Sequence, residues 1–100
     1  MTVFSSNPST GIGTLQSVPG ASANGTALGT MPDGAVGARF YLPTGASVTF
    51  TIIDTAPSSP PTALFTVSQA SSGPNWDETL SAGQMIYVTA LSGAPLFRWF

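Results

Sequence analysis

Two arginines and four carboxylates are the only charged side chains in this chain of 100 residues. The sequence contains no lysine, histidine or cysteine. Ser-His-Asp and Cys-His nucleophiles, His/Cys metal sites and Schiff-base lysines are therefore excluded. The residues left to carry acid–base chemistry are Arg39, Arg98, Asp33, Asp54, Asp77 and Glu78.

A pair of carboxylates is the remaining catalytic option, because two acids can flank a glycosidic bond. Asp77 and Glu78 are adjacent, so a strand would direct them to opposite faces of its sheet. Nothing in the spacing of Asp54 and Glu78 requires them to meet. We therefore expect a protein that is not an enzyme and that uses no metal or cofactor.

Trp76 is a candidate binding residue, since it lies beside two acids in a segment bounded by proline and glycine. Exposed tryptophans often carry the binding energy of interfaces. Trp76 would stack on a sugar ring or fill a partner's pocket. Alternatively, it folds back as a lid over one end of the domain.

The composition restricts the classes of partner. Charged residues make up 6% of the chain, with a net charge of −2, against about 25% in typical soluble proteins. Two arginines far apart in sequence do not form a phosphate-binding surface, so we expect no nucleic acid. No run approaches the roughly 20 apolar residues of a membrane helix, and the N-terminus lacks the pattern of a signal peptide. The charge-poor surface is either partly covered by neighbours or kept soluble by hydroxyl groups.

Alternation of apolar and polar residues predicts short β-strands in the segments 36–42, 47–54, 62–69 and 83–91. Residues 70–83 hold either a helical turn capped by Asn75 or an edge strand through 78–80. Short strands without a convincing helix predict an all-β fold. We expect a small β-sandwich or barrel, Ig-like or jelly-roll-like.

The first third of the chain differs from the rest. It is rich in Gly, Ser, Thr, Asn and Ala, and no helical or alternating period runs through it. We interpret residues 1–30 as an extended or flexible N-terminal arm and residues 31–100 as the β-domain. Phe4, Ile12 and Leu15 are the apolar residues with which this arm would contact a neighbour.

The final segment, LFRWF at 96–100, carries three aromatic residues in a row of five. Burial of each aromatic contributes roughly 1.5–3 kcal/mol, so the segment is expected to be a packed strand. On a strand, Phe97 and Trp99 share one face, and Arg98 and Phe100 the other. A core strand is favoured over an interface with another chain. A covered Arg98 would need an acidic partner, for which Asp54 is a candidate.

The arm followed by RFYLPTGASVTFTI and TLSAGQMIYVTALSGAPLFRWF resembles the small accessory virion proteins of tailed bacteriophages, of the head decoration or cement type. The resemblance implies a structural protein of the virion, made in the host cytoplasm. Its partners would be the major capsid protein or other virion subunits, and it would form a homo-oligomer. The alternative is a carbohydrate- or receptor-binding β-module of a phage tail. The candidate interface residues are Phe4, Ile12, Leu15, Trp76, Phe97, Arg98, Trp99 and Phe100.

Overall fold

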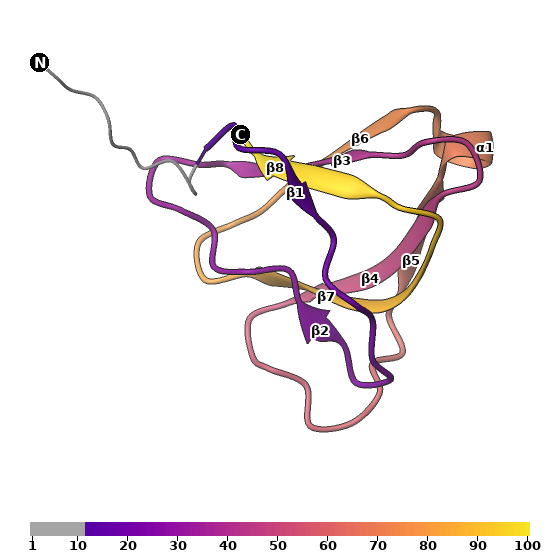
Figure 1. Ribbon diagram of the computed structural model, residues 1–100. Coiled ribbons are helices and arrows are strands. Elements are labelled where there is room, and N and C mark those ends of the chain that lie inside the picture. Colours follow the sequence, from indigo (N-terminus) through magenta and orange to yellow (C-terminus); the bar gives the residue numbers. More distant parts are fainter. Residues whose placement is uncertain (1–11) are drawn as a thin grey trace, which may run out of the picture.

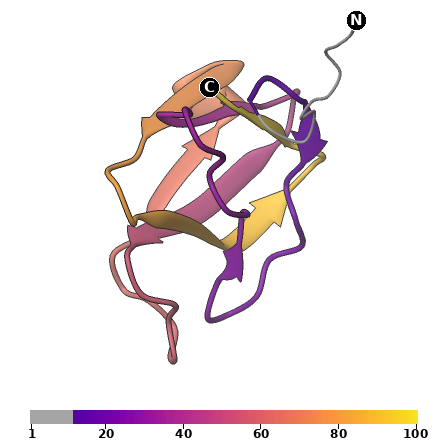
Figure 2. The same cartoon turned by 90° about the vertical axis from the view of Figure 1, so that its left-hand side faces the viewer.

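Two four-stranded antiparallel sheets face each other in the computed structural model, which describes residues 12–100 (Figures 1 and 2). The first sheet has the order β1 (Gln16–Ser17), β8 (Leu96–Trp99), β3 (Gly37–Tyr41), β6 (Asn75–Thr79). The second has the order β2 (Thr26–Ala27), β7 (Met85–Ser92), β4 (Ser47–Ile53), β5 (Phe65–Ser68). The predicted small all-β sandwich is confirmed.

The strand order is that of a jelly roll. β1 pairs with β8, β2 with β7, β3 with β6 and β4 with β5, as in one long hairpin. Rolling this hairpin up brings β8 beside β3 and β7 beside β4, which completes the two sheets. Between the two predicted types of sandwich, the topology is therefore the jelly roll and not the Ig-like one.

The core is formed by the inward positions of the alternating strands. The largest fully buried side chains include Phe40 of β3, Phe50 of β4 and Phe97 of β8. Phe40 and Phe50 stack across the sandwich with ring centroids 5.4 Å apart. Phe97 meets Trp99 edge to face at 5.5 Å. The final segment thus contributes one face to the core, as the favoured interpretation expected.

Residues 12–30, the described part of the predicted arm, run in extended form along both sheets. The Gly13 N–H donates to the Trp99 carbonyl at 2.8 Å, and the Leu28 N–H donates to the Ile86 carbonyl at 2.9 Å. Val18 and Leu28 are buried in the shared core. Phe4 lies outside the described residues, and the domain boundary near residue 30 stays a prediction.

The segment 70–83 contains the edge strand β6, which starts earlier than expected. One helical turn, α1 (Gln69–Ser72), precedes it, and its N-cap is Ser68, whose hydroxyl accepts from the Ser71 N–H at 3.2 Å. The prediction of a helix capped by Asn75 was therefore wrong, because Gly73, with φ of 85°, ends the turn before Asn75. Within residues 12–100, no helix has the length and hydropathy needed to cross a bilayer.

Candidate interaction surface

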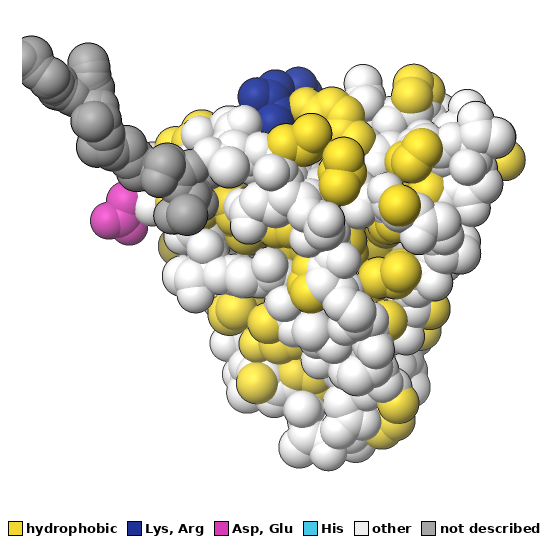
Figure 3. Space-filling model, in the orientation of Figure 1, with side chains coloured by type: hydrophobic (Ala, Val, Ile, Leu, Met, Phe, Trp, Pro, Cys, Tyr) yellow, Lys and Arg dark blue, Asp and Glu magenta, His cyan; other side chains and the backbone are white. Residues whose placement is uncertain are grey.

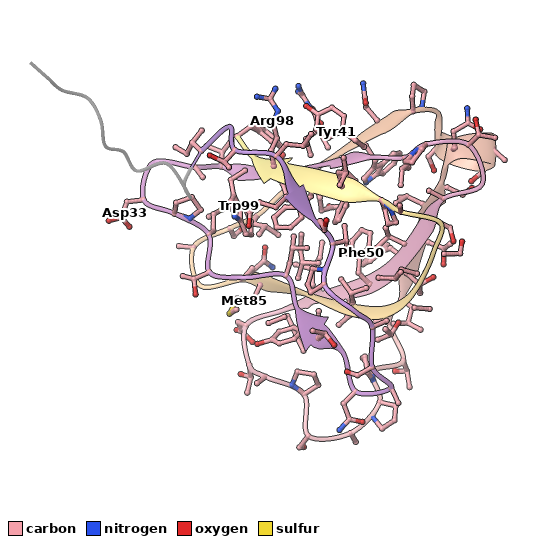
Figure 4. The ribbon with its side chains drawn as sticks, in the orientation of Figure 1. Asp33, Tyr41, Phe50, Met85, Arg98 and Trp99 are labelled. Atoms are coloured by element: carbon pink, nitrogen blue, oxygen red, sulfur yellow. The ribbon has the colours of Figure 1, made fainter. Side chains whose placement is uncertain are left out.

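Both arginines lie on the outer face of the β1-β8-β3-β6 sheet. The strand register places Arg39 opposite Arg98 on one side and opposite Asp77 on the other. Arg98 and Tyr41 project from the top of the molecule in Figure 4, and Figure 3 shows the basic side chains beside hydrophobic ones there. Like charges directly opposite each other in a sheet repel, so each arginine requires its own partner.

Arg39 is paired within the chain. Its Nε and Nη2 donate to the two carboxylate oxygens of Asp77 at 2.6 and 2.9 Å. The Phe100 ring centroid lies 5.4 Å from its guanidinium carbon. The hydrogen bond to Asp77 is the main reason why the pKa of Arg39 is raised, and the same bond lowers the pKa of Asp77. Two parallel hydrogen bonds fix both side chains in one orientation.

Arg98 has a different environment. Its Nε donates to the Tyr41 hydroxyl at 2.6 Å, and its guanidinium carbon lies 6.0 Å from the Tyr41 ring centroid. Among residues 12–100, no carboxylate forms a salt bridge with Arg98. The prediction that Asp54 pairs with Arg98 was wrong, because Asp54 follows β4 in the opposite sheet. There its carboxylate accepts a hydrogen bond from the Thr55 hydroxyl at 3.4 Å. Arg98 therefore presents a positive charge that Tyr41 orients and that Asp77, which forms no salt bridge with it, offsets only in part.

Apolar side chains lie on the same face of the sheet as Arg98. Leu15, which comes just before β1, is 53% exposed, and Phe100 is half-buried beside Arg39. We call Leu15, Tyr41, Arg98 and Phe100 the arginine face. Three of these four were predicted candidates, brought together by the pairing of β1 with β8 and β8 with β3. Tyr41 was missed as a binding residue, although strand alternation places it on the same face as Arg39.

The strands of the opposite sheet carry no charged residue. None of the strands β2, β7, β4 and β5 contains an acidic or basic residue. Hydroxyl groups pair across these strands instead, Ser47 with Ser92 at 2.8 Å and Thr49 with Thr66 at 3.0 Å. Charge is therefore concentrated on one of the two outer sheet faces.

The other predicted interface residues are separated from this face. Phe97 and Trp99 are 1% and 3% exposed, so they belong to the core. Ile12 is half exposed and precedes β1. Trp76 is 40% exposed on edge strand β6, opposite the core residue Phe40.

The residues of the predicted sugar site, Trp76, Asp77 and Glu78, lie on two different faces of β6. The Trp76 Nε1 donates to a Glu78 carboxylate oxygen at 3.0 Å on the inward side of the strand. Asp77 points to the outer face, and a surface hollow of about 480 Å³ at this edge is lined by Arg39, Asn75, Asp77 and Trp76. Trp76 and Asp77 thus face opposite ways, as strand alternation requires.

In comparisons with protein-family models, curated proteins and solved structures, nothing matches this chain. Its function must therefore be inferred from the residues of this surface.

The Arg39–Asp77 pair makes the stability of the fold depend on pH. Because the folded state lowers the pKa of Asp77, the pair stabilises the fold above the ordinary pKa of an aspartate, about 3.9. This contribution is lost as pH falls through the lower folded pKa. We expect Asp77→Asn to reduce the acid-induced shift of the urea midpoint. The effect should be small, since exposed ion pairs contribute little.

The matched control for this experiment is Asp33→Asn, which removes a carboxylate from an exposed turn. Urea midpoints measured from neutral pH to about pH 2 should follow the wild type in this variant. Identical pH profiles for wild type and Asp77→Asn would contradict the predicted role of Asp77.

Proposed function

We propose that the protein is a structural virion protein of the capsid decoration or cement type. It stabilises a particle by binding neighbouring protein subunits through the arginine face. The observation that carries this proposal is the state of Arg98, which Tyr41 holds in place without a carboxylate, beside the exposed Leu15.

The chemistry of the face suits a protein partner. Arginine and tyrosine are enriched among the residues that dominate interface energies. A carboxylate of the partner would form a salt bridge with Arg98 by accepting hydrogen bonds from the guanidinium N–H groups that do not bind Tyr41. An apolar side chain beside that carboxylate would cover Leu15. The partner is therefore a major capsid protein or another virion subunit that presents an acid within an apolar patch.

Two further features support assembly. The chain as a whole is poor in charge, with six charged side chains in 100 residues, and surfaces of this kind favour association. Jelly rolls also occur in viral capsid proteins, which supports the proposal by analogy of fold. A contact of ordinary size, about 800 Å² per partner, would be multiplied over a lattice by avidity. The chain would be made in the host cytoplasm and carried in the virion.

Arg98→Ala tests the proposal. Purified particles of the virus that encodes the chain should contain it, and particles stripped of it should rebind the wild-type protein. The variant should rebind at least roughly 30-fold more weakly, the loss expected for an interface residue worth about 2 kcal/mol. Cosedimentation with particles over a range of protein concentrations measures this loss.

Ser58→Glu is the control, because it changes the net charge by the same amount in the exposed loop between β4 and β5. This loop lies at the bottom of Figure 1, away from Arg98. It should rebind like the wild type. Absence of the chain from particles, or equal rebinding by Arg98→Ala, would refute the proposal.

A further inference from the structure

The first sheet ends in an edge strand that is free to pair. Of the four edge strands, β1 and β2 have two residues each, β5 has four and β6 has five. Figures 1 and 2 show β6, in orange, at the border of its sheet with no strand beyond it. We propose that β6 pairs antiparallel with β6 of a second copy, which joins two first sheets into one continuous sheet.

The backbone of β6 presents its unused groups outward. The Leu80 N–H donates to the Val36 carbonyl at 2.9 Å, and the Pro74 carbonyl accepts from the Leu42 N–H at 2.8 Å. Residues 74 and 80 therefore direct their backbone groups toward β3. Since these directions alternate along a strand, Asn75, Asp77 and Thr79 direct their N–H and C=O groups away from the sheet. All three residues are exposed.

The usual protection of a sheet edge is weak along β6. Natural edges are blunted by short strands, proline, lysine, bulges or inward-pointing charged residues. The strand contains no proline and no lysine. The charge of Asp77 is matched by Arg39, and the Glu78 carboxylate accepts from the Trp76 indole. Of these protective devices, β6 carries only the inward-pointing carboxylate of Glu78, which is held by the Trp76 indole.

A twofold axis through the middle of β6 defines which residues of the two copies would be paired. A twofold axis at Asp77 places Asn75 opposite Thr79 of the second copy and Trp76 opposite its Glu78. The two Asp77 carboxylates then meet, each already held by the Arg39 of its own copy. The outer face then carries the order Arg39, Asp77, Asp77, Arg39, in which the charge of each facing acid is balanced by the arginine of its own copy.

Apolar side chains at this side of the sandwich also favour a second copy. Trp76 is 40% exposed on β6, and Phe65 is 52% exposed on β5. The two strands lie on the same side, because only α1 and the short stretch after it connect them. Phe65 is directed toward the core residue Phe50, at a centroid distance of 5.9 Å. A neighbouring strand would remove more of these aromatic surfaces from water.

Thr79→Pro is the direct test. Proline removes the outward N–H of residue 79 and leaves the bonds toward β3 in place, a substitution that edge strands tolerate. Light scattering and sedimentation equilibrium over a range of concentrations should find a dimer for the wild type. Because the change occurs twice in the dimer, the dissociation constant should rise at least roughly tenfold. Thr79→Val keeps the N–H and should dimerise like the wild type.

A second variant and a check of folding distinguish the loss of dimerisation from the loss of the fold. Asn75→Pro removes another outward N–H, at the first residue of the strand, and should also weaken the dimer. In each variant, an unchanged indole NMR signal of the buried Trp99 shows that the sandwich is intact. A wild type that stays monomeric at all concentrations would overturn the proposal. So would a folded Thr79→Pro protein that dimerises with wild-type affinity, or a wild-type oligomer other than a dimer.

This inference does not depend on the proposed function. Dimerisation is measured on the isolated protein, and Arg98→Ala should leave it unchanged because Arg98 lies on β8. Loss of rebinding to particles in Arg98→Ala, with the dimer preserved, separates the two proposals.

Discussion

Replacement of Phe97 by alanine is expected to lower the free energy of unfolding by about 3–5 kcal/mol, the usual cost of removing a buried phenylalanine. The Phe97 side chain is 1% exposed and packs edge to face on Trp99. The total stability of a small domain is about 5–15 kcal/mol. The variant should therefore be close to unfolding at 37 °C. Urea denaturation followed by circular dichroism measures the loss.

Phe100→Ala provides the comparison within the same segment. Phe100 is half-buried on the outer face, where its ring covers the Arg39 guanidinium. Its removal leaves no enclosed cavity, so we expect a loss of about 1 kcal/mol. Equal losses in the two variants would mean that both faces of β8 are packed to the same degree, contrary to the described burial.

Gly37→Ala is expected to displace β6 from β3. A Cβ atom on Gly37 would overlap the Glu78 carbonyl oxygen and lie 2.9 Å from the Thr79 Cα. These are backbone atoms, which cannot rotate away as a side chain can. Overpacking typically costs about 1–3 kcal/mol, and detachment of an edge strand would add to this cost. Urea denaturation, together with hydrogen exchange of the β6 amides, would detect both effects.

Gly20→Ala is the matched control. Nothing lies within 4 Å of a Cβ at this position, and its φ is not in the left-handed region. The same substitution there should be neutral or stabilising by up to about 1 kcal/mol, through the entropy of the unfolded chain. A Gly37→Ala protein as stable as wild type would show that β3 and β6 do not pair in this register.

The strands that form the core were predictable because each carries its own period. Alternation placed Ala38 and Phe40 on one face, and Val48 and Phe50 on another, and all four are buried. Periodicity did not define β1 and β2, since each has two residues in a segment without alternation. Their conformation is set by their partners β8 and β7, which lie far along the chain.

The interaction surface could be predicted only in part. The C-terminal segment identified Arg98 and Phe100, but the Arg98–Tyr41 contact joins residues 57 positions apart. The Arg39–Asp77 pair spans 38 positions. Such contacts follow from strand order and register, which no local pattern encodes. Asp54 was wrongly paired with Arg98 because the sequence does not reveal that β4 and β8 lie in different sheets.

The antiparallel edge at β6 has a geometric consequence for particle binding. The local twofold axis between antiparallel strands is perpendicular to the plane of their sheet, so a β6 dimer turns both arginine faces toward the same side. On a shell that repeats the proposed acidic site at fixed separations, one dimer would span two such sites. The second contact is then intramolecular, and the combined affinity can exceed that of a single face by about 10²–10⁴. Such a dimer would bind an intact lattice through two sites at once and hold neighbouring subunits together. It would dissociate readily from isolated subunits, which offer one site each.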